Sequence, residues 1–151
     1  MNMFKTFFIT LFLSVLVMMS GCNSTDKQEQ QSKICPECHM PLPASNKNTA
    51  FVKQDSKITY FDDVGCMVLW AKENNIDLEK VKVKVFTNDT KKYEDAFKLN
   101  YRIDEKTPMH YGFGAYEHKT KNTIDFNEVI LRMLRGENMA NPKIRKQILG
   151  Y

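Results

Sequence analysis

Sulfur-bearing residues gather in a few short segments of this 151-residue chain, and their types and spacing suggest chemistry. The first segment is Cys35-Pro36-Glu37-Cys38-His39-Met40. Two cysteines three positions apart can share one metal ion or form a disulfide. His39 could add an imidazole nitrogen, and Met40 a thioether. The pattern leaves a metal site, a structural disulfide and a thioredoxin-like redox pair open, although prolines soon after Met40 argue against the helix that a redox pair normally begins.

Two further segments carry candidate ligands. Phe61-Asp62-Asp63-Val64-Gly65-Cys66-Met67 places Cys66 in the expected first turn of a helix, where the helix dipole favours a thiolate. Met67 falls on the apolar stripe of that helix, so packing explains it better than ligation. In Thr107-Pro108-Met109-His110-Tyr111-Gly112, no apolar periodicity accounts for Met109, and His110 offers another imidazole. Met109 is therefore a candidate ligand.

The donor types indicate a soft metal. Thiolates and thioethers select Cu(I), whereas hard cations prefer carboxylates and zinc sites rarely use methionine. The chain has four cysteines. If Cys22 carries a lipid, as argued below, three remain, and a framework of disulfides alone would leave one thiol over. Both observations favour a metal site.

The elements that position these segments can be read from apolar periodicity. Residues 49–53 and 57–61 alternate in polarity around a turn at 54–56, which predicts a hairpin. Asp62 or Asp63 then offers an N-cap for a helix that ends near Asn74-Asn75. Its apolar stripe is formed by Val64, Met67, Val68 and Ala71.

Val81, Val83 and Val85, separated by lysines, predict a further strand. A similar order then recurs, with strands expected at 98–103 and at 111–118. A helix follows with Phe126, Val129, Ile130, Met133 and Leu134 on one face, ends at Gly136, and precedes a short helix that opens at Asn141-Pro142. The sequence therefore predicts an α+β fold: two similar β-β-α(-β) units with an antiparallel sheet in a single compact domain, with a short C-terminal helix.

The N-terminus predicts a bacterial lipoprotein. The apolar run from Phe7 to Met19 follows Lys5 and is too short to span a bilayer. It leads into Ser20-Gly21-Cys22, the small residues and cysteine of a lipoprotein signal. We expect a signal peptide at 1–21, lipidated Cys22 with a flexible tether at 22–33, and the functional domain at 34–151. The protein would be membrane-anchored and would face the periplasm or cell exterior, with an outer membrane favoured by the residue after the cysteine, which is not the usual retention aspartate.

The charge pattern gives little sign of a charged partner. The net charge is +4 and the lysines are scattered along the chain, so the footprint of a nucleic-acid-binding protein is missing.

In combination these motifs resemble the NosL family, copper-binding lipoproteins that assist assembly of nitrous oxide reductase. The resemblance is carried by the cysteine before the tether, the C-x-x-C-x-M segment at Cys35–Met40, the FDD-x-GCM segment at Phe61–Met67, and the TPM segment at Thr107–Met109. It covers nearly the whole of 34–151, with the motifs in the same order.

The resemblance implies a monomeric Cu(I) metallochaperone that holds one ion and catalyses nothing. By matching position, the ligands would be Cys38, Met40 and Met109, with Cys35 and His110 as contributors. Cys66, Met67 and His39 are secondary candidates. The implied partners are an ABC-type transporter complex and a recipient copper enzyme such as nitrous oxide reductase.

Two departures from the family pattern leave the ligand set open. The family usually has glycine where this chain has His39, and His110 and Tyr111 separate Met109 from Gly112. Two alternatives to the copper carrier also stand. One is a thiol-disulfide oxidoreductase that uses Cys35 and Cys38, and the other is a structural zinc module in which Cys66 and a histidine complete the site.

Overall fold

The computed structural model describes residues 34–151, which belong to one compact unit. The predicted signal peptide, Cys22 and tether lie outside the described residues, so they stay predictions. Within 34–151, no helix combines the length and the apolar character needed to cross a bilayer.

The predicted hairpin is confirmed. Strand β1 (Ala50–Gln54) pairs antiparallel with β2 (Lys57–Phe61), and the turn between them places Asp55 in the left-handed region. The alternation in polarity has a direct structural cause, because Ala50, Val52 and Phe61 face the core and are almost fully buried.

The helix that follows is also confirmed. Helix α2 (Val64–Glu73) begins directly after Asp63, whose side chain accepts a hydrogen bond from the Gly65 N–H. Its apolar stripe is buried as expected, and it ends at Asn74. This helix contacts both β1 and β2, so its first turn stands beside the end of β2.

The main sheet is completed by two more strands. Strand β3 (Lys82–Phe86) pairs with the free edge of β1, and β4 (Tyr93–Asp95) pairs with β3, which gives the antiparallel order β2-β1-β3-β4. A short 3₁₀ helix precedes β3 (Leu78–Lys80), and another follows β4 (Ala96–Lys98). Strand β4 was not predicted from the sequence, because three residues are too few to show alternation.

The second half of the domain contains shorter strands than predicted. Strand β5 (Asn100–Arg102) pairs with β6 (Gly114–Tyr116) in a separate two-stranded sheet. Helix α3 (Phe126–Arg135) ends at Gly136, whose left-handed backbone closes the helix, and α4 (Pro142–Leu149) follows in place of a further strand. The helix faces were predicted well except at Leu134, which is exposed.

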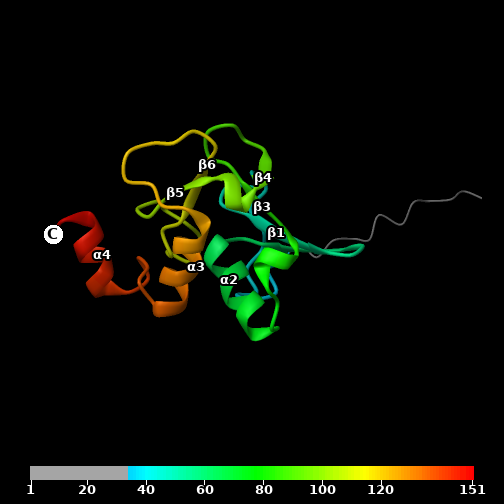
Figure 1. Ribbon diagram of the computed structural model, residues 1–151. Helices are drawn as coiled ribbons and strands as arrows, with labels where there is room; N and C mark the ends of the chain where they lie inside the picture. Colours follow the sequence, from blue (N-terminus) through cyan, green and yellow to red (C-terminus); the bar gives the residue numbers. More distant parts are fainter. Residues whose placement is uncertain (1–33) are drawn as a thin grey trace, which may run out of the picture. The chain divides into compact units, whose positions relative to one another are not determined.

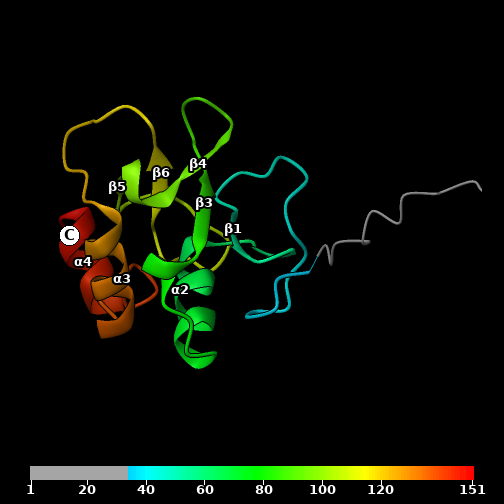
Figure 2. The ribbon, with the colours of Figure 1, turned by 45° about the vertical axis from the view of Figure 1, so that its right-hand side comes forward.

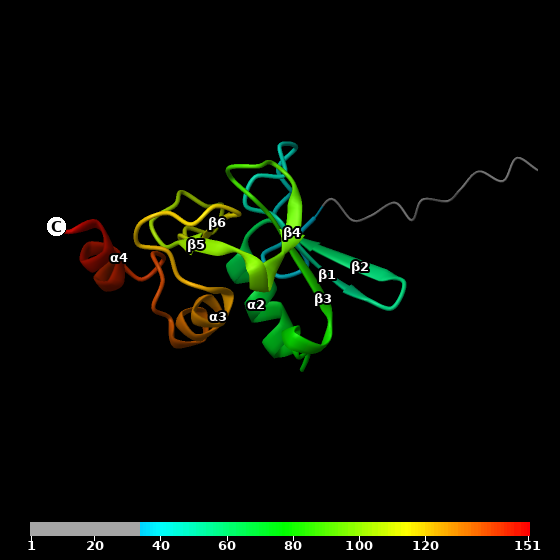
Figure 3. The same cartoon turned by 45° about the horizontal axis from the view of Figure 1, so that its top comes forward.

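Helices α2 and α3 pack against each other, and the ribbon views show them together beside the sheets, with α4 beyond α3 (Figures 1, 2 and 3). The α+β class with an antiparallel sheet and a short C-terminal helix is therefore confirmed. The core runs continuously from the main sheet through α2 to α3 and the small sheet. Its largest fully buried side chains include Phe61, Met67, Tyr101, Phe113 and Phe126.

Replacing Tyr101 with phenylalanine should lower the free energy of unfolding by about 1 kcal/mol, the usual net value of one buried hydrogen bond. The Tyr101 hydroxyl is fully buried and donates to the Ala96 carbonyl at 3.0 Å. Urea denaturation would measure the change. Tyr60→Phe at a partly exposed ring is the matched control and should change stability by less than about 0.5 kcal/mol. Equal effects in the two variants would contradict the expectation.

Candidate metal centre

The first part of the site is a closed turn formed by Cys35–Met40. The Cys35 N–H donates to the Met40 carbonyl at 2.8 Å, and the His39 N–H donates to the Cys35 carbonyl at 3.0 Å. An isolated antiparallel bridge between Ile34 and Pro41 closes its base. The segment is a turn rather than a helix, as the prolines after Met40 predicted. This turn brings the two cysteines to the same side.

The second part comes from the junction between β2 and α2. Asp62 follows the last residue of β2, and Cys66 lies in the first turn of α2, four positions later. Both residues are fully buried. Because the hairpin and the helix are fixed by the core, Cys66 is held by α2 itself and Asp62 by the two-residue connection between β2 and α2.

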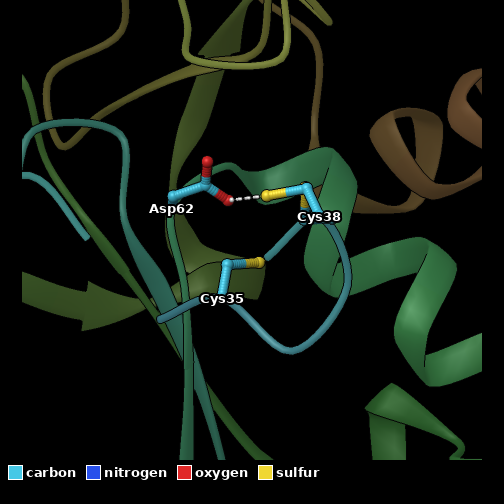
Figure 4. A group of neighbouring side chains, drawn as sticks. Cys35, Cys38 and Asp62 are labelled. Atoms are coloured by element: carbon cyan, nitrogen blue, oxygen red, sulfur yellow. Dashed lines mark hydrogen bonds between the residues drawn. The ribbon is translucent and has the colours of Figure 1, made fainter. Parts of the chain in front are cut away.

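The two parts meet in one cluster. The Sγ atoms of Cys35, Cys38 and Cys66 and a carboxylate oxygen of Asp62 all lie within 4.8 Å of one another. Figure 4 shows the Cys38 thiol directed at Asp62, with the Cys35 thiol beside them. The Cys38 Sγ donates to Asp62 Oδ1 at 3.1 Å. Three thiols and one carboxylate that converge at this range can bind a metal ion.

The three thiols differ in their acidity. The hydrogen bond from Cys66 is the main reason that the pKa of Cys35 falls to about 7; burial opposes it, and the backbone N–H groups of Cys38 and Asp62 assist. Burial raises the pKa of Cys38 to about 12. The pKa of Cys66 is also raised, first by its hydrogen bond to Cys35 and then by burial. One thiolate is thus stabilised in the buried part of the cluster.

Asp62 has spare bonding capacity. Its Oδ1 accepts from Cys38, but its buried Oδ2 has no hydrogen-bond partner among the described residues. A buried carboxylate oxygen that lacks a partner is costly, and such groups are usually paired or bound to a metal. The acid therefore fits a position beside a cation.

The structure brings some of the predicted ligands of the Cys35–Met40 segment into the cluster and leaves others outside it. Cys35 and Cys38 belong to the cluster, with Cys35 fully buried and Cys38 half-buried. Met40 lies at the end of the turn with 41% of its surface exposed. His39 is exposed, and its imidazole is outside the cluster as far as residues 34–151 are concerned. Ligation by Met40 stays a prediction.

The TPM segment contacts the start of α2, the helix that carries Cys66. The Met109 N–H donates to Asp63 Oδ2 at 3.2 Å, and the Met109 side chain is half-buried against the core. The Tyr111 ring lies against Gly65, since a Cβ on that glycine would sit 2.2 Å from the ring. Burial raises the pKa of Tyr111 to about 12, and the charges of Cys66 and Asp63 add to the rise. The loop therefore borders the start of α2.

The remaining candidates fall outside the cluster. His110 is exposed, and its imidazole is not among the four grouped side chains of the described region. Met67 is fully buried in the core, in agreement with packing as its role. Ligation by Met109 and His110 was not contradicted, and it stays a prediction.

Sequence reasoning missed Asp62 and gave Cys66 too little weight. A signal for both was present. Only one of the two aspartates at the end of β2 can cap α2, and the structure assigns that role to Asp63, which leaves Asp62 for the cluster. Cys66 follows Asp62 by four residues, a spacing that brings the two side chains together across the helix start.

The unusual residue of the turn can be tested. His39 has a φ of 61°, in the left-handed region that favours glycine, which gives a physical reason for the glycine of the family pattern. His39→Gly should therefore leave metal affinity within about threefold of the parent and keep or raise stability by up to about 1 kcal/mol. A competition titration and urea denaturation would measure these. A tenfold or larger loss of affinity would instead make His39 a ligand.

Comparison with protein-family models, with curated proteins and with solved structures finds no match to this chain.

Proposed function

We propose that this chain is an extracytoplasmic lipoprotein that carries Cu(I) and catalyses no reaction. The observation that carries the proposal is the convergence of Cys35, Cys38 and Cys66 within 4.8 Å, with two of the thiols fully buried. Thiolates are soft donors that favour Cu(I). The resemblance to NosL supports the same metal and suggests delivery, through an ABC-type transporter complex, to nitrous oxide reductase or a related copper enzyme.

Carriage is favoured over a structural metal site by the extent of the core. Tyr101 in β5, Phe126 in α3 and Phe113 directly before β6 are buried, and all three lie far along the chain from the turn that carries Cys35 and Cys38. Domains that need a structural zinc ion are generally those too small to build such a core. We therefore expect the domain to remain folded when it releases its ion, as a carrier must.

Carriage is also favoured over thiol-disulfide exchange. An exchange enzyme needs an accessible thiol that is readily ionised. Here the pKa of the half-buried Cys38 is raised to about 12, while Cys35, with a pKa of about 7, is fully buried. Accessibility and acidity are thus found on different cysteines.

Zinc is the second candidate, and Asp62 is the observation that favours it. Three thiolates and one carboxylate oxygen form a four-ligand set of the kinds that Zn²⁺ accepts. Cu(I) remains the first candidate because two segments next to the cluster each carry a thioether: Met40 ends the turn that begins at Cys35, and the Met109 N–H bonds to Asp63, the neighbour of Asp62. Thioethers are soft ligands and are not among the usual ligands of zinc.

An anaerobic Cu(I) titration of the reduced full-length protein, against a competing colorimetric chelator, tests the proposal. One tightly bound equivalent, and a circular dichroism spectrum that stays folded after the metal is removed, would support a carrier. A parallel Zn²⁺ titration provides the comparison. Retention of zinc but not copper, with unfolding on chelation, would replace the carrier with a structural zinc module, and failure to bind either metal would refute both.

A further inference from the structure

Asp63 accepts hydrogen bonds from more than the helix that it caps. Its Oδ1 accepts from the Gly65 N–H at 2.9 Å, which caps α2. Its Oδ2 accepts from the Met109 N–H at 3.2 Å, across 46 positions of sequence. Burial raises the pKa of this carboxylate overall, although the Thr107 side chain also interacts with it and lowers that pKa. A single fully buried side chain therefore ties the start of α2 to the 107–111 loop.

The 107–111 loop is shaped to present that N–H group. The His110 N–H donates to the Thr107 carbonyl at 3.0 Å, which makes residues 107–110 a β-turn with Pro108 at its second position. Met109 occupies the third position, whose N–H is not used by the turn itself. Asp63 accepts from this group. The turn and the carboxylate together fix the backbone from which the Met109 side chain departs.

A second contact fixes the same loop independently of Asp63. The Tyr111 ring packs on the backbone of Gly65, where a Cβ would overlap the ring at 2.2 Å. The Thr107 hydroxyl in turn accepts from the Gly112 N–H at 3.3 Å. The Tyr111 contact is made with Gly65, which stands between Asp62 and Cys66 in the sequence, so it holds the loop against the start of α2.

We infer that Asp63 is a positioning residue for metal binding: it holds the 107–111 loop against the first turn of α2 and so places Met109 at the cluster of Cys35, Cys38 and Cys66. This inference rests on the proposed function. Asp63 does not itself coordinate the ion; it acts through Met109.

The variant Asp63→Asn isolates this role. Asparagine is as good an N-cap as aspartate, and its one carbonyl oxygen can still accept from Gly65. Its amide nitrogen cannot accept from the Met109 N–H, so the link to the loop is lost. Groups that orient metal ligands are typically worth about 10- to 100-fold in affinity, and we expect Cu(I) binding to weaken by that factor.

A double-mutant cycle distinguishes positioning from a general structural role. If Asp63 acts through Met109, Asp63→Asn should weaken Cu(I) binding in the parent protein but have no further effect in a Met109→Ala background. The control is Asp125→Asn at the cap of α3, which bonds to the Glu128 N–H on the exposed surface. That variant should leave Cu(I) affinity unchanged.

Unchanged affinity in Asp63→Asn, or an equal loss with and without Met109, would overturn the inference while leaving the carrier function intact. Unchanged affinity in Met109→Ala would do the same. If Asp63→Asn is not folded by circular dichroism, Thr107→Val removes the hydroxyl that accepts from the Gly112 N–H and interacts with the Asp63 carboxylate, and the same cycle is read with it. A parent protein that binds no Cu(I) would overturn the proposed function and this inference together.

Discussion

Cys66→Ser should abolish tight Cu(I) binding. Cys66 is fully buried in the first turn of α2, and its Sγ lies within 4.8 Å of the Sγ atoms of Cys35 and Cys38. Serine keeps the size and the hydrogen-bonding capacity of the side chain but replaces a soft donor with a hard one. Changes to groups outside the ligand set typically weaken metal affinity by about 10- to 100-fold, and we expect a larger loss of Cu(I) affinity here. Competition with a Cu(I) chelator would measure it.

The adjacent residue provides the control. Met67 is equally buried, carries sulfur and belongs to the core. Met67→Leu conserves volume, so it should cost less than about 1.5 kcal/mol of stability and leave Cu(I) affinity unchanged. A Cys66→Ser protein that is folded and still binds one Cu(I) tightly would remove Cys66 from the ligand set. The ligands implied by the family resemblance, Cys38, Met40 and Met109, would then be preferred.

The elements that hold the site could be predicted because their signals are local. The hairpin of β1 and β2 shows in the alternation of residues 49–61, and α2 shows in a stripe that begins with Val64. Strand β4 could not be predicted. Its three residues are ordered by pairing with β3, a long-range interaction that leaves no periodic trace in Tyr93-Glu94-Asp95.

The site itself was predictable only in part, for the same reason. The pairing of Cys35 with Cys38 is local, since a closed turn joins them. The spacing of four residues between Asp62 and Cys66 relates these two to each other, but their meeting with Cys35 and Cys38 depends on how the turn packs against the β2–α2 junction, a long-range contact. A helix N-cap also explained the presence of an aspartate at 62 or 63, so the second aspartate received no separate explanation.

Asp62 is the residue that should decide between the two metals. Its carboxylate belongs to the cluster, and its Oδ2 lacks a hydrogen-bond partner within the described part of the chain. If the site is built for zinc, this oxygen completes a four-ligand set. If it is built for Cu(I), the three thiolates suffice, and Asp62 accepts from the protonated Cys38 thiol at 3.1 Å only while the site is empty.

Asp62→Asn should therefore separate the metals. The amide keeps an oxygen that can accept from Cys38 but removes the negative charge and weakens oxygen ligation. We expect Zn²⁺ affinity to fall by more than about 100-fold, beyond the range for changes outside the ligand set, and Cu(I) affinity to change by less than about threefold. Parallel titrations with chelators specific for each metal would measure both.

The ratio of the two affinities carries the conclusion, because any general loosening of the site would weaken both metals together. Asp125→Asn at the exposed cap of α3 makes the same chemical change far along the chain and should alter neither affinity. An equal loss for Cu(I) and Zn²⁺ in Asp62→Asn would mean that the carboxylate shapes the cluster through Cys38. A loss confined to Cu(I) would contradict a thiolate site for copper and make Asp62 one of its ligands.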